Sequence, residues 1–351
     1  MHLLMLLLFP LVMASPDFSV WANRKVAPDP HPERAADYRF VAQHFQQIDR
    51  LIRDHPERIT PFVVGHSVER RPIWGFRIGY PDETPTRKVL VFAQLHALEW
   101  IGSEVATTYV ESLLEYPPEG LESLMGGLPR GVEVVVVPLV NPDGRHRSEQ
   151  DMIEDRVRAY RRGNARKVDL NRDWSTNREA TAFWRHFLPA YYSTTEYAFS
   201  QPETRAIDRL AQEGFDVVVS LHAFGGYIYY PWGGRFYRID DREEHERLGH
   251  IMAEAQDGRP YKVKQLSHWG FLFRIQGAEL DHFYGTYGYN SFLIELTRGG
   301  IRPFQPSTWR DYFRWYNPAD PAPHVLDGVG SLMALTKEMG RQVMAEEREQ
   351  R

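Results

Sequence analysis

The sequence predicts a single α/β domain in which helices cover both faces of a central sheet. Four short segments contain runs of consecutive apolar residues, as strands buried on both faces do, and helical segments lie between them. The 351 residues show no internal repeat and no break between domains, and large α/β enzymes often use such a length as one domain. The composition, 42% hydrophobic and 25% charged, is ordinary for a globular protein.

The first fourteen residues predict a secretory signal. Met1 to Ala14 form an apolar stretch that is too short to span a bilayer but fits a signal-peptide core. Val12 and Ala14 give the small-residue pattern of a cleavage site, although Lys and Arg are missing from the basic n-region. We therefore expect a secreted or periplasmic protein. Residues 15–35, rich in Pro, Asp and Arg, are expected to be a linker, and residues 36–348 the folded domain.

The folded domain is expected to start with a helix and two strand-like runs. Apolar residues recur at helical spacing from Tyr38 to His55, and alternating runs follow from Ile59 to Ile78. The buried strands are predicted at Val89–His96, Val132–Val140, Asp216–His222 and Asn290–Leu296. Further helices are predicted at Trp100–Leu114, Pro202–Gln212 and Val325–Glu346. Residues 145–178 are polar and are expected to be irregular.

Charge and cysteine content narrow the chemistry. A formal net charge of -5 without long basic or acidic runs gives no reason to expect a nucleic-acid partner. The chain has no cysteine, which excludes disulfides, thiolate nucleophiles and cysteine metal sites. Any bound metal must therefore be held by histidine and carboxylate side chains.

The pattern His-x-x-Glu occurs three times, beginning at His66, His96 and His146. Such a pair is a weak signal by itself, because some of the 14 histidines must match by coincidence. His66 lies in a turn before a strand, and His146 lies in an arginine-rich polar loop. Only His96 ends a predicted buried strand, with Glu99 at the start of the next helix. Position in the fold therefore separates the three pairs better than spacing does.

Two other buried strands end in residues of the same kind, His222 and Glu295. In open α/β sheets, ligands bind outside the carboxyl ends of the strands. Two histidines and a glutamate form a catalytic zinc set that leaves one position for water, and a further carboxylate can take a proton from that water. One such residue alone is more often a hydrogen-bonded buried histidine or a capping glutamate. Three strand ends together favour a zinc-dependent hydrolase.

Two arginine-bearing segments suit a substrate that carries a carboxylate. Asn171 and Arg172 lie in VDLNRDW, and Tyr160-Arg161-Arg162 lies upstream. An arginine fork holds a carboxylate bidentately, and an arginine near a scissile carbonyl stabilises the developing oxyanion. Four other arginines are expected to be solvated surface residues: Arg145, Arg147, Arg156 and Arg158.

At these residues the chain resembles the zinc metallocarboxypeptidases related to carboxypeptidases A and B. The motifs that carry the resemblance occur in the family's order: GHSVERRPIWGFRIG, QLHALEWIG, NPDG, VDLNRDW, SQPETRAI, SLHAFGGYIYYPWG and YGYNSFLIEL. The resemblance extends from about Tyr38 to the C-terminal helix. It implies a twisted, mixed and largely parallel central sheet of about eight strands.

The resemblance implies a role for each residue of the metal site. His96, Glu99 and His222 look like the ligands of one Zn²⁺ per chain. Glu295 looks like the general base that activates water and then passes its proton to the leaving amine. Asp169 matches an aspartate that orients the first zinc histidine.

The resemblance also implies how a substrate is held. Asn171 and Arg172 look like the pair that grips the terminal carboxylate. Arg161 follows Tyr160 where the family commonly has Trp-Arg, so it resembles the oxyanion-stabilising arginine. The adjacent Arg162 is a rival for that role.

One position departs from the family's pattern. Phe273 stands eight residues before Asp281, where the family usually has a Tyr whose hydroxyl closes over bound substrate. We therefore expect hydrolysis to persist, with capping of the substrate weaker or different. The adjacent Arg274 is a candidate to compensate.

Leu280 falls at the position that mainly sets side-chain preference in the family. With Ile275 and Gly233 at neighbouring matched positions, it predicts a peptide or protein substrate with an apolar or aromatic C-terminal residue. The adjacent Glu279 would reverse this preference if the loop shifted by one residue.

Other readings remain open from sequence. Secreted digestive members of the family carry an inhibitory pro-domain, and the short segment before residue 36 leads us to expect none here. No membrane span is expected either. A zinc amidohydrolase of the same fold, acting on N-acyl amino acids or cell-wall peptides, is the first alternative. A non-catalytic peptide-binding relative is the second, and the retained ligands and Glu295 argue against it.

Overall fold

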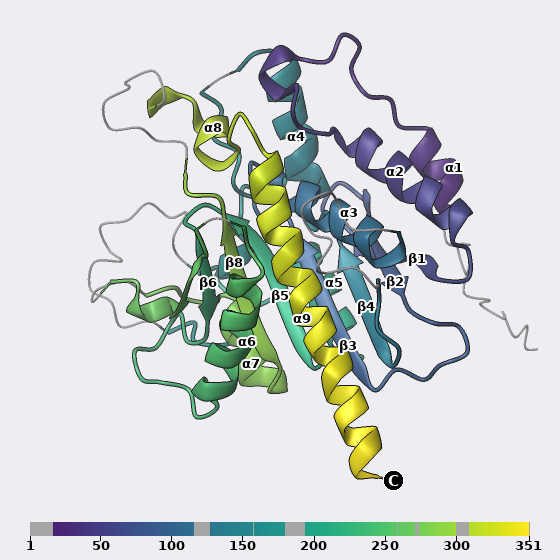
Figure 1. Ribbon diagram of the computed structural model, residues 1–351. Helices are drawn as coiled ribbons and strands as arrows, with labels where there is room; N and C mark the ends of the chain where they lie inside the picture. Colours follow the sequence, from purple (N-terminus) through teal and green to yellow (C-terminus); the bar gives the residue numbers. More distant parts are fainter. Residues whose placement is uncertain are drawn as a thin grey trace, which may run out of the picture.

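Eight strands of the described chain form one mixed sheet (Figure 1). The computed structural model describes residues 17–115, 127–156, 158–179, 194–257, 259–270, 274–299 and 309–350. The strands lie in the order β1-β2-β4-β3-β5-β8-β6-β7. Their bounds are β1 Ile59–His66, β2 Pro72–Ile78, β3 Arg87–Ala93, β4 Val132–Val137, β5 Val217–Ala223, β6 Tyr227–Tyr230, β7 Lys262–Gln265 and β8 Asn290–Leu296.

The middle of the sheet is parallel and its flanks are mixed. β4, β3, β5 and β8 run parallel to one another, whereas β1 with β2, β2 with β4, and β6 with β8 pair antiparallel. The predicted fold class is thereby confirmed, including helices on both faces. The central parallel strands are the four buried strands of the sequence, and their carboxyl ends lie at one edge of the sheet.

Alternate residues of β3, β4 and β5 belong to two separate cores. On β3, Val89 and Val91 belong to one hydrophobic cluster, whereas Leu90 and Phe92 belong to another. Because successive side chains of a strand point to opposite faces, a continuous apolar run requires helices on both sides. The sequence pattern therefore follows directly from the two-sided covering.

Most of the larger core lies under a group of helices, of which α9 runs across the sheet (Figure 1). These helices are α1 Phe18–Asn23, α2 Val41–Asp54, α3 Trp100–Leu114, α6 Arg242–Glu254 and α9 Ala322–Glu349. The smaller core lies on the opposite face, under α5 Pro202–Ala211 and α7 Glu279–Tyr287. The remaining elements are α4 Pro142–Ile153, α8 Tyr312–Tyr316 and the short 3₁₀ turns η1 Glu33–Ala35, η3 Leu170–Arg172 and η6 Leu266–His268.

The structure differs from the sequence-based prediction near the NPDG turn. Pro142 begins helix α4, which Asn141 caps by accepting a hydrogen bond from the Gly144 backbone N at 2.9 Å, so residues 142–153 are not irregular. The expectation that Arg145 is a solvated surface residue is wrong. It is fully buried, donates to Glu149 Oε1 at 3.1 Å and lies over the Trp100 ring. A buried guanidinium is tolerable here because a carboxylate and an aromatic face surround it.

The segment before residue 36 is partly folded. Phe18 and Ala22 of α1 are buried in the larger core, and Phe18 contacts Trp74 and Phe76 edge to face. The described part of the expected linker is thus packed on the domain over this stretch. The predicted signal peptide, residues 1–14, lies outside the described residues.

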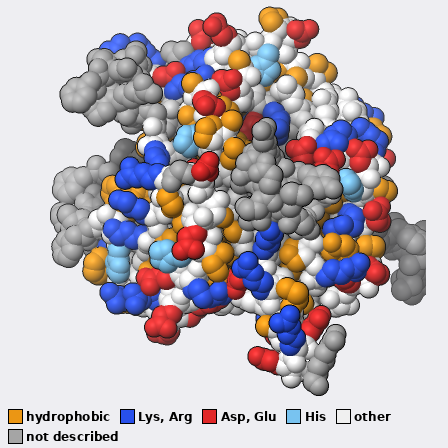
Figure 2. All heavy atoms as spheres, viewed as in Figure 1, with side chains coloured by type: hydrophobic (Ala, Val, Ile, Leu, Met, Phe, Trp, Pro, Cys, Tyr) orange, Lys and Arg blue, Asp and Glu red, His pale blue; other side chains and the backbone are white. Residues whose placement is uncertain are grey.

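The face that carries α9 shows acidic and basic side chains interspersed (Figure 2). No helix among the described residues is both long enough and apolar enough to cross a membrane. The mixed surface agrees with the small net charge of the chain.

Candidate metal centre and active site

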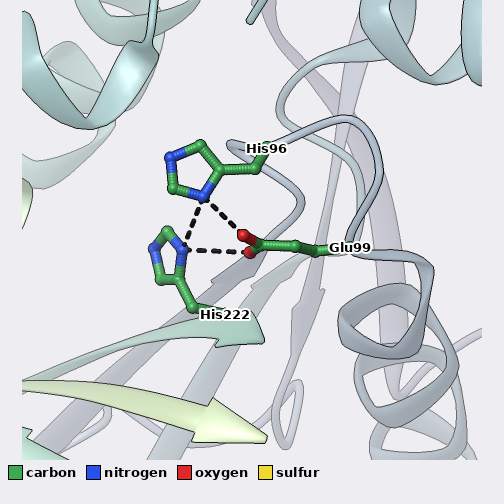
Figure 3. Close-up of side chains that lie close together, drawn as sticks. All are labelled: His96, Glu99 and His222. Atoms are coloured by element: carbon green, nitrogen blue, oxygen red, sulfur yellow. Dashed lines mark hydrogen bonds and ion pairs between the residues drawn. The ribbon is translucent and has the colours of Figure 1, made fainter. Parts of the chain in front are cut away.

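Three buried side chains converge at the carboxyl edge of the central strands (Figure 3). His96 Nδ1 lies 2.8 Å from Glu99 Oε1, and His222 Nδ1 lies 3.2 Å from Glu99 Oε2. The two Nδ1 atoms lie 3.1 Å apart. Among the described residues, no other group of three His, Cys, Asp or Glu side chains brings its donor atoms within the same 4.8 Å.

The opposite nitrogen of each ring faces a carboxylate. His96 Nε2 lies 2.9 Å from Asp169 Oδ1, and His222 Nε2 lies 2.9 Å from Glu279 Oε1. A carboxylate acceptor favours the tautomer in which Nε2 carries the proton and donates it. Both Nδ1 atoms are then left with a lone pair directed at the centre of the cluster.

This arrangement fits a divalent cation. Two lone pairs and a carboxylate that face one another at about 3 Å repel unless a positive charge lies between them. Burial alone would lower the pKa of His222, but Glu279 and Glu99 outweigh it and raise that pKa to about 10, which shows how strongly this position favours positive charge. Two imidazoles and one carboxylate are a donor set suited to Zn²⁺, with one position left open for water.

Backbone geometry explains why these residues meet. His96 and Glu99 lie in the segment between β3 and α3, and His222 is the second-last residue of β5. The Ala223 backbone N donates to Glu99 Oε2 at 3.2 Å, which ties the turn to the neighbouring strand. His222 is paired in register with Glu295 on the parallel strand β8. The strand ends thus place three potential ligands and a second carboxylate, Glu295, together.

Glu295 is the least satisfied carboxylate of the group. Its Oε2 is buried and has no hydrogen-bond partner among the described residues. Burial, together with the charge of Glu99, raises the pKa of Glu295 to about 8. Such a carboxylate favours its protonated form in the protein alone, and a cation bound nearby would act in the opposite direction. An unpaired oxygen beside a metal site is suited to taking a proton from water.

The two adjacent arginines point to different partners. Arg162 Nε donates to Asp169 Oδ2 at 2.8 Å, and Arg162 Nη1 lies 3.7 Å from Glu99 Oε1. Arg161 pairs instead with Asp151 on α4, through Nη2 to Oδ1 at 3.0 Å. Arg162 thus contacts the ligand cluster, whereas Arg161 contacts Asp151 on α4, and this favours the rival, Arg162, for an oxyanion role.

Asn171 and Arg172 form part of the turn η3 and are both buried. The Glu279 backbone N donates to Asn171 Oδ1 at 3.1 Å, so the amide oxygen is occupied and Asn171 Nδ2 is the group left to donate. Asp169 begins the turn by accepting from the Asn171 backbone N at 2.9 Å. The charges of Arg162, His96 and Arg172 overcome burial and hold the pKa of Asp169 well below its usual range.

Asp173, which the sequence did not single out, anchors this turn. It is fully buried and accepts from Ser200 Oγ at 2.6 Å, from the Gln201 backbone N at 2.9 Å and from Thr204 Oγ1 at 2.5 Å. These bonds join VDLNRDW to the start of α5, which explains why SQPETRAI accompanies it.

The residues expected to set substrate preference also meet. Leu280 is fully buried in a small apolar cluster with Tyr229, Leu266 and Leu293, and Ile275 packs against it. Gly233 approaches the same cluster, since a Cβ on it would lie 3.0 Å from Leu266 Cδ2. Asp281 accepts from the Gly233 backbone N at 2.6 Å and from the Gly234 backbone N at 2.9 Å. Phe273 lies outside the described residues.

In the other two His-x-x-Glu pairs, the glutamate takes part in ion pairs and hydrogen bonds away from the metal site. Glu69 pairs with Arg71 and Arg147, and His66 is exposed at the end of β1. Glu149 is held by the Val41 backbone N at 2.7 Å and by the buried Arg145. Neither pair joins a third potential ligand among the described residues.

A family model and several known proteins match most of this chain. The family model Peptidase M14, zinc carboxypeptidase, matches residues 45–313. A zinc carboxypeptidase from Simulium vittatum is 24% identical over 262 residues, covering 71% of this chain and 82% of that protein. Carboxypeptidase B2 of Mus musculus is 22% identical over 293 residues, covering 79% of this chain and 67% of that protein.

Solved structures share the fold. The crystal structure of thrombin activatable fibrinolysis inhibitor has a TM-score of 0.68 at 18% identity, covering 91% of this chain and 78% of that chain. Carboxypeptidase A from Helicoverpa armigera has a TM-score of 0.66 at 19% identity, covering 92% of this chain and 78% of that chain. At such identities the likeness concerns the fold alone.

Proposed function

Because this chain belongs to the zinc carboxypeptidase family, we propose that it is a zinc-dependent enzyme that hydrolyses the C-terminal peptide bond of peptides or proteins. The observation that carries the proposal is the convergence of His96, Glu99 and His222, with Asn171 and Arg172 buried nearby. The first group suits a metal, and the second suits a terminal carboxylate. Glu279 connects them, since its side chain contacts His222 and its backbone N contacts Asn171.

In the proposed site, His96 and His222 would hold one Zn²⁺ through Nδ1, and Glu99 would hold it through its carboxylate. Zinc bound there supplies Lewis-acid polarisation of the scissile carbonyl and lowers the pKa of a coordinated water. Asp169 is proposed to keep the His96 ring in the tautomer that leaves Nδ1 free.

Glu295 is the proposed general base. Its register pairing with His222 fixes it beside the ligand cluster, and its unpaired Oε2 can accept a proton from water. The same carboxyl group then returns that proton to the leaving amine. A carboxyl whose pKa is raised by burial holds and releases a proton more readily near neutral pH than an ordinary glutamate does.

Arg162 is the proposed oxyanion-stabilising residue, in preference to Arg161. Its guanidinium is fixed by Asp169 at the edge of the ligand cluster, so it requires little rearrangement when charge develops on the substrate oxygen. Asn171 Nδ2 and the Arg172 guanidinium are proposed to bind the terminal carboxylate of the substrate. The buried apolar cluster around Leu280 favours an apolar or aromatic C-terminal residue.

A matched pair of peptides tests the proposal. A peptide ending in free Phe should lose that residue in the presence of the zinc-loaded protein, and the same peptide with an amidated C-terminus should be a poor substrate. A peptide ending in Arg tests the preference, and an N-acylated amino acid tests the amidohydrolase alternative. The Glu295→Gln variant provides the control for contaminating peptidases. Equal hydrolysis of the free and amidated peptides would contradict the carboxypeptidase assignment.

We further propose that residues 1–14 direct export. This rests on the apolar stretch and on the small residues Val12 and Ala14 alone. N-terminal sequencing of the protein recovered from cells and from medium or periplasm tests it. A mature chain that begins near Ser15 is expected, and an exported chain that still begins at Met1 would argue against cleavage.

A further inference from the structure

Glu279 is a buried carboxylate that the proposed reaction does not consume. It begins helix α7 and is 1% exposed. Its Oε1 lies 2.9 Å from His222 Nε2 and accepts a hydrogen bond from Ser220 Oγ at 2.9 Å. Its Oε2 is buried and has no hydrogen-bond partner among the described residues. Among the described residues, no arginine or lysine forms an ion pair with Glu279, and its charge is directed at the His222 ring.

We propose that Glu279 is the positioning residue of the second zinc histidine, with Ser220 holding its carboxylate in place. The inference rests on the zinc site of the proposed function. It adds that each of the two zinc histidines has its own carboxylate partner on Nε2, on the side of the ring away from the metal position. Glu279 and Ser220 serve His222 as Asp169 serves His96. The two pairs have the same 2.9 Å separation from Nε2, although the carboxylates come from different segments of the chain.

The physical reason lies in the imidazole ring. A neutral histidine has one protonated nitrogen, and only the other can bind a metal. A carboxylate on Nε2 fixes that proton, orients the ring and raises the basicity of Nδ1. Without Glu279, His222 would lose this bias toward the metal-binding tautomer. The ring would also lose its anchor in the direction away from Glu99.

The environment of Glu279 supports a functional reason for its burial. A buried carboxylate with one unsatisfied oxygen is costly to the fold. On the same strand, Ser220 precedes His222 by two residues, so both side chains lie on one face of β5. One face of β5 therefore carries both the metal ligand His222 and Ser220, which donates to the Glu279 carboxylate.

Glu279 also contacts the substrate side of the site through its backbone. Its N–H donates to Asn171 Oδ1 at 3.1 Å, and a side-chain substitution leaves this donor in place. Loss of the carboxylate should therefore affect metal binding and turnover more than recognition of the terminal carboxylate. This separates a positioning role from a general disturbance of the pocket, which would raise KM as well.

The test measures zinc affinity on the full chain, independently of catalysis. Zinc is removed and restored in competition with a chromophoric chelator, for wild type, Glu279→Gln and Ser220→Ala. Glu243→Gln is the matched control, because Glu243 is likewise in the first turn of a helix but is exposed. The zinc Kd should rise by about 10–100-fold in Glu279→Gln. A smaller rise is expected in Ser220→Ala and none in Glu243→Gln.

Two further readouts distinguish positioning from structural damage. At saturating zinc, kcat of Glu279→Gln should fall while KM for a free-carboxylate peptide stays within about twofold. The visible spectrum of the Co²⁺-substituted protein should also change, because the geometry around His222 changes. A wild-type zinc Kd and Co²⁺ spectrum in folded Glu279→Gln would overturn the proposal. If that variant does not fold, an unchanged zinc Kd in Ser220→Ala overturns it.

The outcome is separable from that of the proposed function. Zinc binding that depends on Glu279, in a protein without peptidase activity, would contradict the function and leave the positioning role standing. Peptidase activity with a zinc Kd insensitive to Glu279 would contradict the positioning role alone.

Discussion

The metal centre and the adjoining apolar cluster are held in different ways. At the metal centre, each histidine has a fixed partner on its outer nitrogen, and Glu99 accepts from the Ala223 backbone N. The apolar cluster around Leu280 is held by packing, with Asp281 as a polar clamp on the glycines at its edge. Directional hydrogen bonds fix the first region, and volume filling fixes the second.

This difference separates the residues proposed to carry out hydrolysis from those proposed to set the substrate preference. Hydrogen-bonded ligands lose their function when one partner is removed, because the remaining polar atoms are left unsatisfied. A packed apolar cluster tolerates changes of shape more readily. Substitutions at the metal centre should therefore abolish turnover, and substitutions in the cluster should change which residue is removed.

The largest effect is expected from removing a ligand. His222→Ala should lose bound zinc and more than about a hundredfold in kcat/KM, because even residues that only support ligands are worth about 10–100-fold. Mass spectrometry measures the zinc content, and hydrolysis of a peptide with a free C-terminal carboxylate measures kcat/KM. His66→Ala, which changes an exposed histidine of a different His-x-x-Glu pair, should keep both at wild-type values. Full zinc occupancy in His222→Ala would remove this residue from the ligand set.

The next largest effect is expected at Glu295. Glu295→Gln keeps the shape of the side chain but cannot accept and return a proton, so kcat should fall by about 10²–10⁴-fold. Zinc content should stay at that of wild type. A variant that keeps its zinc and most of its kcat would show that another group acts as the base.

Arginine substitutions distinguish the two candidates for the oxyanion. Arg162→Ala should lower kcat by about 10²–10³-fold, because a preorganised donor is lost. Arg161→Ala should lower it by less than about fivefold, because that side chain pairs with Asp151 on α4. Steady-state kinetics with one peptide compare the variants, and the reverse order would restore Arg161 to the oxyanion role.

A smaller effect is expected in the apolar cluster. Leu280→Ala should lower kcat/KM for a peptide ending in Phe by about tenfold, because a few apolar contacts are worth about 1–3 kcal/mol. Zinc affinity should not change, which sets this variant apart from those at the metal centre. A thermal melt accompanies the kinetics, since a cavity at a fully buried leucine also lowers stability. An unchanged preference between Phe and Arg would place the specificity pocket elsewhere.

The last prediction concerns the pH dependence of stability in the zinc-free protein, not its activity. The pKa of Glu295 is raised from 4.5 to about 8, so the folded state binds this proton more tightly than the unfolded state does. The group therefore lowers the free energy of unfolding as pH rises from about 4.5 to about 8. Denaturant melts of zinc-free wild type and Glu295→Gln across this range should diverge accordingly. A constant difference between them would contradict the raised pKa.

Much of the fold was predictable because its signals are local. Continuous apolar runs predicted β3, β4, β5 and β8, and their ends placed His96, His222 and Glu295 at one edge. Helix α4 was missed because Arg145 and Asp143, which it buries, are residue types that usually stay exposed. Their burial depends on partners far along the chain, such as Ser67 for Asp143.

The remaining site could not be predicted for a related reason. Arg161 and Arg162 are adjacent in a segment that is neither helix nor strand. No periodic pattern in the sequence therefore tells which of the two side chains is directed at the metal site. From sequence, Glu279 bears only on substrate preference. Its contact with His222 is not apparent there, because the two residues are 57 positions apart. Nothing local to Glu279 distinguishes it from an ordinary acidic residue in the first turn of a helix.

The register of β5 and β8 has a consequence for how such an enzyme diversifies. His222 and Glu295 face each other across a parallel ladder, so main-chain hydrogen bonds set the spacing between metal and base. The connecting segments beyond these strands can then vary in length and sequence without disturbing that spacing. New substrate preferences can arise by exchange of surface loops, whether by natural drift or by grafting in the laboratory, while the hydrolytic pair is inherited unchanged.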